Sequence, residues 1–216
     1  MDPGMNQLLK WSVENSSAST SDPTTAPPTS QINPEAMNAL FGGPSDADLM
    51  LSSMSVITSP DPELTIYMKL IAFDNFEQLI QNLDNANNLG PLALWTPLLG
   101  CLESAESEIR KMAAWCVGTA VQNNVSSQER LLAMGGIPRL AKLAVDEGEG
   151  ERVRRKAVYA LSSACRNYQP AMDVLTAELE KLGRDEWACK VDAGDMDACD
   201  RLIVAMREEA AKGKKE

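Results

Sequence analysis

Cysteines and carboxylates are the first groups to consider for nucleophilic, acid–base or metal chemistry in this 216-residue chain, which contains no histidine. That absence excludes a histidine general base, a Ser-His-Asp triad and a histidine-ligated metal. The cysteines form no C-x-x-C pair, and their odd number fits a disulfide framework poorly. We expect Cys116 and Cys165 to be small buried groups in a reducing compartment, with a reactive thiol as the alternative. No metal or cofactor is expected. The five cysteines are Cys101, Cys116, Cys165, Cys189 and Cys199.

The glycine-rich and acidic stretches give no better case for an enzyme. Residues 147–151 read Glu-Gly-Glu-Gly-Glu, and the carboxylates of such a loop would repel a phosphate group. Asp195 and Asp197 form an acidic pair of the kind that is common at solvated helix ends. Since nothing in the sequence marks a cleft around any acidic pair, we expect a protein without catalytic activity.

Two polar clusters are stronger candidates for partner contact. The first spans residues 82–88 and the second spans residues 122–124, each at the end of a predicted long helix. Helix termination is the alternative, because asparagine tolerates left-handed geometry and caps helices. That role accounts for one or two residues in each cluster, but not for five polar residues in seven positions. The predicted partner-binding residues are Asp84, Asn85, Ala86, Asn87, Asn88, Gln122, Asn123 and Asn124.

Internal repeats indicate what positions these clusters. Residues 109–123 and 153–167 align at a spacing of 44, and residues 72–82 align with 113–123 at a spacing of 41. A period in the low forties with helical patterning is typical of armadillo and HEAT repeats. We therefore predict an all-α fold, an armadillo/HEAT-like right-handed superhelical solenoid, whose curved surface binds another macromolecule.

The pattern also predicts element boundaries and three domains. A capping box at Ser126 and Glu129 is expected to begin a short helix. The last two helices are expected to cap the solenoid, as atypical terminal units do. Long helices are predicted over residues 62–83, 107–123, 151–167, 171–182 and 196–211. The domains are a flexible N-terminal segment with a short amphipathic helix (1–31), the repeat domain (32–183), and a C-terminal capping helix with a basic tail (184–216).

The N-terminal segment carries Leu8, Leu9 and Trp11 ahead of a stretch, residues 16–30, that is rich in Ser, Thr, Pro and Ala. Such a composition buries too little apolar surface to fold, so the segment is expected to be disordered. The three apolar side chains then either function on a flexible segment away from the core or dock back onto the solenoid. The sequence shows no signal peptide and no long apolar run, which predicts a cytoplasmic protein.

Charge and aromatic spacing limit the kind of partner. The net charge of −11 disfavours nucleic acid, and it suits either a basic partner or simple solubility. Importin-type armadillo proteins hold basic peptides with Trp and, four residues on, Asn. Here Thr119 follows Trp115 and Ser163 follows Tyr159 at that spacing, so the asparagine ladder is missing. Several basic residues on or beside the same helices would also repel a basic peptide: Arg110, Lys111, Arg154, Arg155 and Lys156.

Five segments resemble one known family. Residues 6–16, Asn-Gln-Leu-Leu-Lys-Trp-Ser-Val-Glu-Asn-Ser, resemble the N-terminal signature of the fungal Fes proteins. These proteins are relatives of the animal Hsp70-binding proteins and the lumenal Sil proteins. Four further segments resemble the core motifs of the family, so that the resemblance covers roughly residues 5–182 in order. They are residues 72–77, 83–88, 118–124 and 156–167.

The resemblance implies a nucleotide exchange factor for 70-kDa heat-shock (DnaK-type) chaperones. In that family an armadillo domain embraces the chaperone's ATPase domain, ADP leaves, ATP enters and the client is released. The resemblance also implies that Leu8, Leu9 and Trp11 help to eject clients from the chaperone's peptide groove. No full repeat is recognisable beyond residue 182, which puts contacts there in doubt. We expect a monomer that binds no nucleic acid and no membrane. The alternative to a nucleotide exchange factor is a general armadillo scaffold that binds extended peptides.

Overall fold

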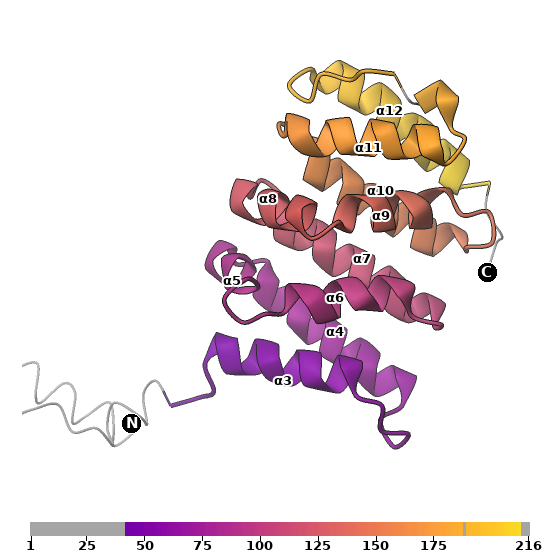
Figure 1. Ribbon diagram of the computed structural model, residues 1–216. Coiled ribbons are helices and arrows are strands. Elements are labelled where there is room, and N and C mark those ends of the chain that lie inside the picture. Colours follow the sequence, from indigo (N-terminus) through magenta and orange to yellow (C-terminus); the bar gives the residue numbers. More distant parts are fainter. Residues whose placement is uncertain (1–41, 188, 213–216) are drawn as a thin grey trace, which may run out of the picture. The chain divides into compact units, whose positions relative to one another are not determined.

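The computed structural model describes residues 42–187 and 189–212, and in these residues it contains ten α-helices, two short 3-10 helices and no strand. The all-α prediction is therefore confirmed for the described part of the chain (Figure 1). None of its helices combines the length and apolar character needed to cross a membrane. The helices are α3 (Asp46–Thr58), α4 (Ile66–Ile80), α5 (Leu83–Asn88), α6 (Trp95–Gly100), α7 (Ser107–Val121), α8 (Val125–Ala133), α9 (Gly136–Val145), α10 (Glu151–Cys165), α11 (Gln169–Lys181) and α12 (Met196–Ala210), with η2 (Cys101–Glu103) and η3 (Asp185–Trp187) between them.

The chain divides into two units, Met1–Ser45 and Asp46–Glu216. All the helices above belong to the second unit, including α12, which packs against α9 and α10. The predicted N-terminal helix, with Leu8, Leu9 and Trp11, lies outside the described residues. The predicted domain boundaries at residues 31 and 183 therefore stay predictions.

Helices of the second unit stack in chain order. The 15-residue helices α4, α7 and α10 pack side by side, with α3 against α4 at one end and α12 against α10 at the other. Figure 1 shows α6, α9 and α11 as a second layer along the same stack. Each long helix contributes one row to a shared core, which is what the sequence repeats predict. The handedness and curvature of the stack stay predictions.

Helices α7 and α10 approach each other closely at Gly118. Gly118 of α7 is buried, and a Cβ atom there would lie 2.5 Å from Cε1 of Tyr159 and 3.0 Å from the Cα of Ala160. Glycine is therefore required by the packing, because the neighbouring helix occupies the space of a side chain. The aromatic ring of Tyr159 is thereby seated directly on the backbone of α7.

Cys116 and Cys165 are fully buried, as predicted. Burial raises the pKa of both thiols well above their ordinary value, and the nearby carboxylates of Glu77 and Asp74 raise that of Cys116 further. Such thiols are unreactive, because they stay protonated at neutral pH and only the thiolate is a good nucleophile. The interpretation of these two cysteines as core residues is confirmed over the reactive alternative.

Asparagines end the long helices and begin the short ones. Asn123 and Asn167 have left-handed backbones (φ of 52° and 57°) at the equivalent turns after α7 and α10. Asn124 caps α8, because its Oδ1 accepts a hydrogen bond from the Ser127 backbone at 3.3 Å. The predicted capping box at Ser126 is wrong, since α8 already begins at residue 125 and Asn124 takes the capping role.

The segment after α11 is tied to the stack by hydrogen bonds. The side chain of Gln169 donates to the Val191 carbonyl at 2.9 Å and accepts from the Ala193 amide at 2.7 Å. The predicted apolar stripe of α12 is buried: Cys199, Leu202, Ile203 and Met206. The end of the described chain therefore covers the α10 side of the core, which fits the predicted capping role.

Candidate partner-binding surface

The first polar cluster forms the short helix α5 and divides into buried and exposed residues. Asn85 is 6% exposed, and its Nδ2 donates to Oδ2 of Asp46 at 2.7 Å and to the Leu79 carbonyl at 3.0 Å. Ala86 is 3% exposed and belongs to the core. Since these two side chains hold α5 against its neighbours, they are placed to support a surface rather than to form one.

The second cluster forms the turn from α7 to α8. Asn124 is buried, and its Nδ2 donates to the Ala120 carbonyl at 3.2 Å in addition to its capping bond. The remaining predicted residues of both clusters reach the surface, where Asn88 is half-buried and the others are exposed: Asp84, Asn87, Gln122 and Asn123. Because α5 packs against both α7 and α8, the exposed residues lie on neighbouring elements.

A line of polar contacts joins the second cluster to the long helices. Glu77 of α4 is 6% exposed; its Oε1 accepts from the Thr119 hydroxyl of α7 at 2.9 Å, and its Oε2 accepts from Nε2 of Gln81 at 2.9 Å. The hydroxyl of Tyr159 on α10 donates to Oε1 of Gln122 at 3.1 Å. These contacts border a shallow hollow of about 390 Å³, here named the α4–α7 hollow, which is lined by Glu77, Gln81, Thr119, Gln122, Asn123 and Tyr159.

A second hollow lies between the exposed sides of α7 and α10 and shares Tyr159 with the first. This α7–α10 hollow has a volume of about 640 Å³ and is lined by Leu70, Asp74, Glu108, Lys111, Met112, Trp115, Arg152, Arg155, Lys156 and Tyr159. Nζ of Lys156 lies 3.9 Å from the ring centre of Trp115, a cation–π contact. Burial lowers the pKa of Lys156, and Glu77 partly opposes that shift.

Two of the basic residues predicted on or beside these helices lie away from this surface, which corrects the prediction. Arg154 is 2% exposed, and its Nε donates to the Ala144 carbonyl at 3.0 Å, so it faces away from the hollows. Arg110 forms an ion pair with Glu149 of the acidic loop at 2.5 Å. The alignment of Trp115 with Tyr159 across two repeats was the available signal for the α7–α10 hollow.

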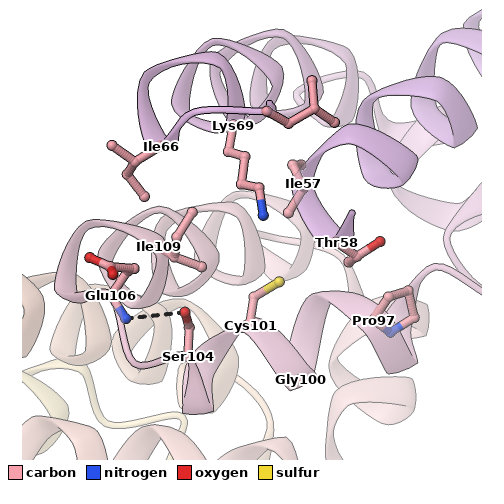
Figure 2. A pocket seen from close by; sticks show the side chains of 11 residues that line it. Ile57, Thr58, Ile66, Lys69, Pro97, Gly100, Cys101, Ser104, Glu106 and Ile109 are labelled. Carbon is pink, nitrogen blue, oxygen red and sulfur yellow. Dashed lines mark hydrogen bonds between the residues drawn. The ribbon is translucent and has the colours of Figure 1, made fainter. Parts of the chain in front are cut away.

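A further hollow, of about 720 Å³, lies among the ends of α3, α4 and α7 and is shown in Figure 2. Its lysine, Lys69, donates to the Ser59 carbonyl at 2.7 Å. Burial raises the pKa of Cys101 to about 11, with Lys69 opposing the shift, so this thiol stays protonated at neutral pH. The arrangement gives no activated nucleophile in this hollow.

The described helices stack in chain order around a shared core, which is the arrangement of helical-repeat proteins. Residues 5–89 match the family described as "Nucleotide exchange factor Fes1", and residues 85–178 match the "SIL1/FES1/HPBP1 C-terminal domain". The chain therefore belongs to the Fes1 family, as the resemblance of the sequence motifs indicated.

Curated relatives carry the same description. The Hsp70 nucleotide exchange factor FES1 of Gibberella zeae is 59% identical over 212 residues, covering 98% of this chain and 99% of the relative. The Hsp70 nucleotide exchange factor fes-1 of Neurospora crassa is 50% identical over 243 residues, covering 97% and 99%. The FES1 protein of Saccharomyces cerevisiae is 44% identical over 169 residues, covering 76% of this chain and 57% of the longer relative.

Proposed function

We propose that this chain is a nucleotide exchange factor that binds the ATPase domain of a 70-kDa heat-shock chaperone and promotes release of ADP. The observation that carries the proposal is the relationship to two named Hsp70 nucleotide exchange factors, at 59% and 50% identity over nearly the whole of both chains. Relatives that match end to end share the whole helix stack, and therefore the surface that the stack presents. We expect the protein to act as a monomer in the cytoplasm.

The proposed mechanism needs no covalent chemistry. The protein binds the opened, ADP-free form of the ATPase domain better than the closed ADP form, and this difference in affinity lowers the affinity for ADP. By linkage, ADP must weaken the binding of this protein by the same factor, typically about 5- to 150-fold. The proposed contacts are the exposed polar residues, with Asn85, Ala86 and Asn124 holding them in place: Asp84, Asn87, Asn88, Gln122 and Asn123.

Fluorescent ADP provides the direct test. The chaperone is loaded with labelled ADP and chased with excess ATP, with and without the purified protein. We expect faster release of the label, and in a pull-down we expect preference for the nucleotide-free or ADP chaperone over the ATP form. Unchanged release would refute the proposal, and equal capture of all chaperone forms would favour a general peptide scaffold.

A substitution at Asn87 tests whether the first polar cluster contacts the chaperone. Asn87 is exposed on α5, so Asn87→Arg should leave the melting temperature unchanged while weakening binding to the ATPase domain by roughly tenfold. Ala177→Arg, on an exposed position of α11, is the matched control and should bind normally. Binding of Asn87→Arg at wild-type affinity would remove α5 from the contact surface.

The buried neighbour of Asn87 should respond differently. Ala86 is 3% exposed, so Ala86→Arg must push α5 outward and should lower the free energy of unfolding by about 1–3 kcal/mol. Binding is then expected to be lost because α5 is displaced, while the helicity of the rest of the stack is retained. Circular dichroism and a urea titration separate this indirect effect from the direct effect at Asn87.

Deleting residues 1–30 tests the proposed role of Leu8, Leu9 and Trp11 in ejecting clients. The truncated protein keeps the whole helix stack, so ADP release should be accelerated as by the full chain. Release of a labelled client peptide, measured by anisotropy after ATP addition, should be slower. Equal client release by both proteins would show that the segment has no part in ejection.

A further inference from the structure

We propose that the α7–α10 hollow receives a carboxylate side chain from the surface of the chaperone's ATPase domain, and that Lys156 is the residue that binds it. The inference rests on the proposed function and concerns the chemistry of the partner at one point of the contact. It identifies Lys156 as a determinant of which chaperone surface is recognised.

The hollow is positively charged in a chain whose net charge is −11. Its lining contains four basic side chains and two acidic ones: Lys111, Arg152, Arg155 and Lys156 against Asp74 and Glu108. A basic depression on an otherwise acidic protein favours an acidic partner group, because complementary charges speed the association of two surfaces and fix their relative position.

Three of the four cations already have carboxylate partners within the chain. Lys111 forms a close ion pair with Glu108, which Arg152 also approaches at 3.7 Å. Arg155 pairs with Glu151 at 2.8 Å. Among the residues that the structure describes, Lys156 forms neither a hydrogen bond nor an ion pair, so its ammonium group is the one left to bind an incoming anion.

Aromatic rings hold that ammonium group in place. Nζ of Lys156 lies 3.9 Å from the ring centre of Trp115 and 5.6 Å from that of Tyr159. The side chain is half-buried, and loss of water lowers its pKa, with Lys111 adding to the shift and Glu77 opposing it. A cation that is fixed in position and poorly hydrated binds a carboxylate strongly, because the side chain loses little conformational entropy and little water when the ion pair forms.

The surroundings fit a glutamate or aspartate on a protein surface rather than a free anion. Leu70, Met112 and Trp115 supply apolar lining that the aliphatic part of such a side chain would cover. Tyr159 lines both hollows and bonds to Gln122, so the lysine lies next to the proposed polar contacts. One partner surface can therefore reach the lysine and the cluster together.

Substitutions at position 156 test the proposal by titration with the labelled, nucleotide-free ATPase domain at low and at physiological salt. Lys156→Met keeps the side-chain stem over Trp115 but removes the charge, and should weaken binding on the order of tenfold. Lys156→Glu should weaken it by roughly 100-fold, while Lys156→Arg should stay near wild type. The gain in affinity at low salt should shrink for Lys156→Met. Lys142→Met, an exposed lysine of α9, should match the wild type.

Each other result would overturn the inference. Wild-type or tighter binding by Lys156→Met would mean an apolar occupant, and tighter binding by Lys156→Glu would mean a basic one. Melting curves verify the fold, and Lys156→Gln replaces any variant that melts early. If the wild type accelerates ADP release and Lys156→Met binds normally, only this inference fails. If the wild type neither binds the ATPase domain nor accelerates release, the proposed function fails as well.

Discussion

Gly118→Val is expected to lower the free energy of unfolding by about 3 kcal/mol, because α7 and α10 meet where residue 118 has no side chain. A Cβ atom at this position would lie 2.5 Å and 2.6 Å from two ring carbons of Tyr159 and 3.0 Å from the Cα of Ala160. The ring could turn aside, but the backbone of α10 must also move. Gly118→Ala should show the same effect at a smaller size, since alanine regains about 1 kcal/mol of helix propensity.

Urea unfolding measures these losses, and Gly100→Ala is the matched control. Gly100 ends α6, is exposed, and has open space around the position of a Cβ atom, so the same substitution should be neutral or stabilising by up to about 1 kcal/mol. Because Tyr159 lines both hollows, the Gly118 variants should also bind the chaperone more weakly. Wild-type stability of Gly118→Ala would mean that moving the ring costs no more than the roughly 1 kcal/mol that alanine regains in helix propensity.

Periodicity was sufficient to predict the long helices, and local chemistry decided where they end. The predicted helices 107–123 and 151–167 begin at the same residues as α7 and α10. The observed helices end two residues earlier than predicted, at Val121 and Cys165. Asparagine adopts the left-handed conformation readily, so the chain turns at Asn123 after α7 and at Asn167 after α10. The predicted start at residue 62 is wrong: Thr65 caps α4 and the helix begins at Ile66.

The polar clusters were visible in the sequence, but the division between support and surface was not. Asn85 is buried because it reaches Asp46 of α3, 39 residues away, and such a contact exists only once the stack has formed. The hollow around Lys156 likewise depends on the pairing of α7 with α10, which places this lysine over Trp115, 41 residues earlier. Spacing within one helix identifies a face, whereas a site shared by two helices needs their packing.

The second large effect concerns the ion pair between Arg110 and Glu149, which joins the start of α7 to the acidic loop before α10. Their side chains are 16% and 11% exposed, and Nη2 of Arg110 lies 2.5 Å from Oε1 of Glu149. Nη1 of Arg110 also donates to the carbonyls of Ser104 and Ala105 at 2.6 Å and 2.8 Å. Thus one of the carboxylates that make this loop unfit for phosphate neutralises a largely buried arginine.

Glu149→Met should therefore lower the free energy of unfolding by about 3–5 kcal/mol, because the guanidinium of Arg110 remains buried without its counter-charge. The double variant Arg110→Met/Glu149→Met should lose less than Glu149→Met alone, since no unpaired charge is left. A double-mutant cycle in urea measures the coupling between the two residues, which must be favourable by more than about 1 kcal/mol. For comparison, Glu151→Met breaks the more exposed pair with Arg155 and should cost at most about 0.5 kcal/mol. Additive losses in the cycle would mean that Arg110 and Glu149 act through separate contacts, with the loop held by its backbone alone.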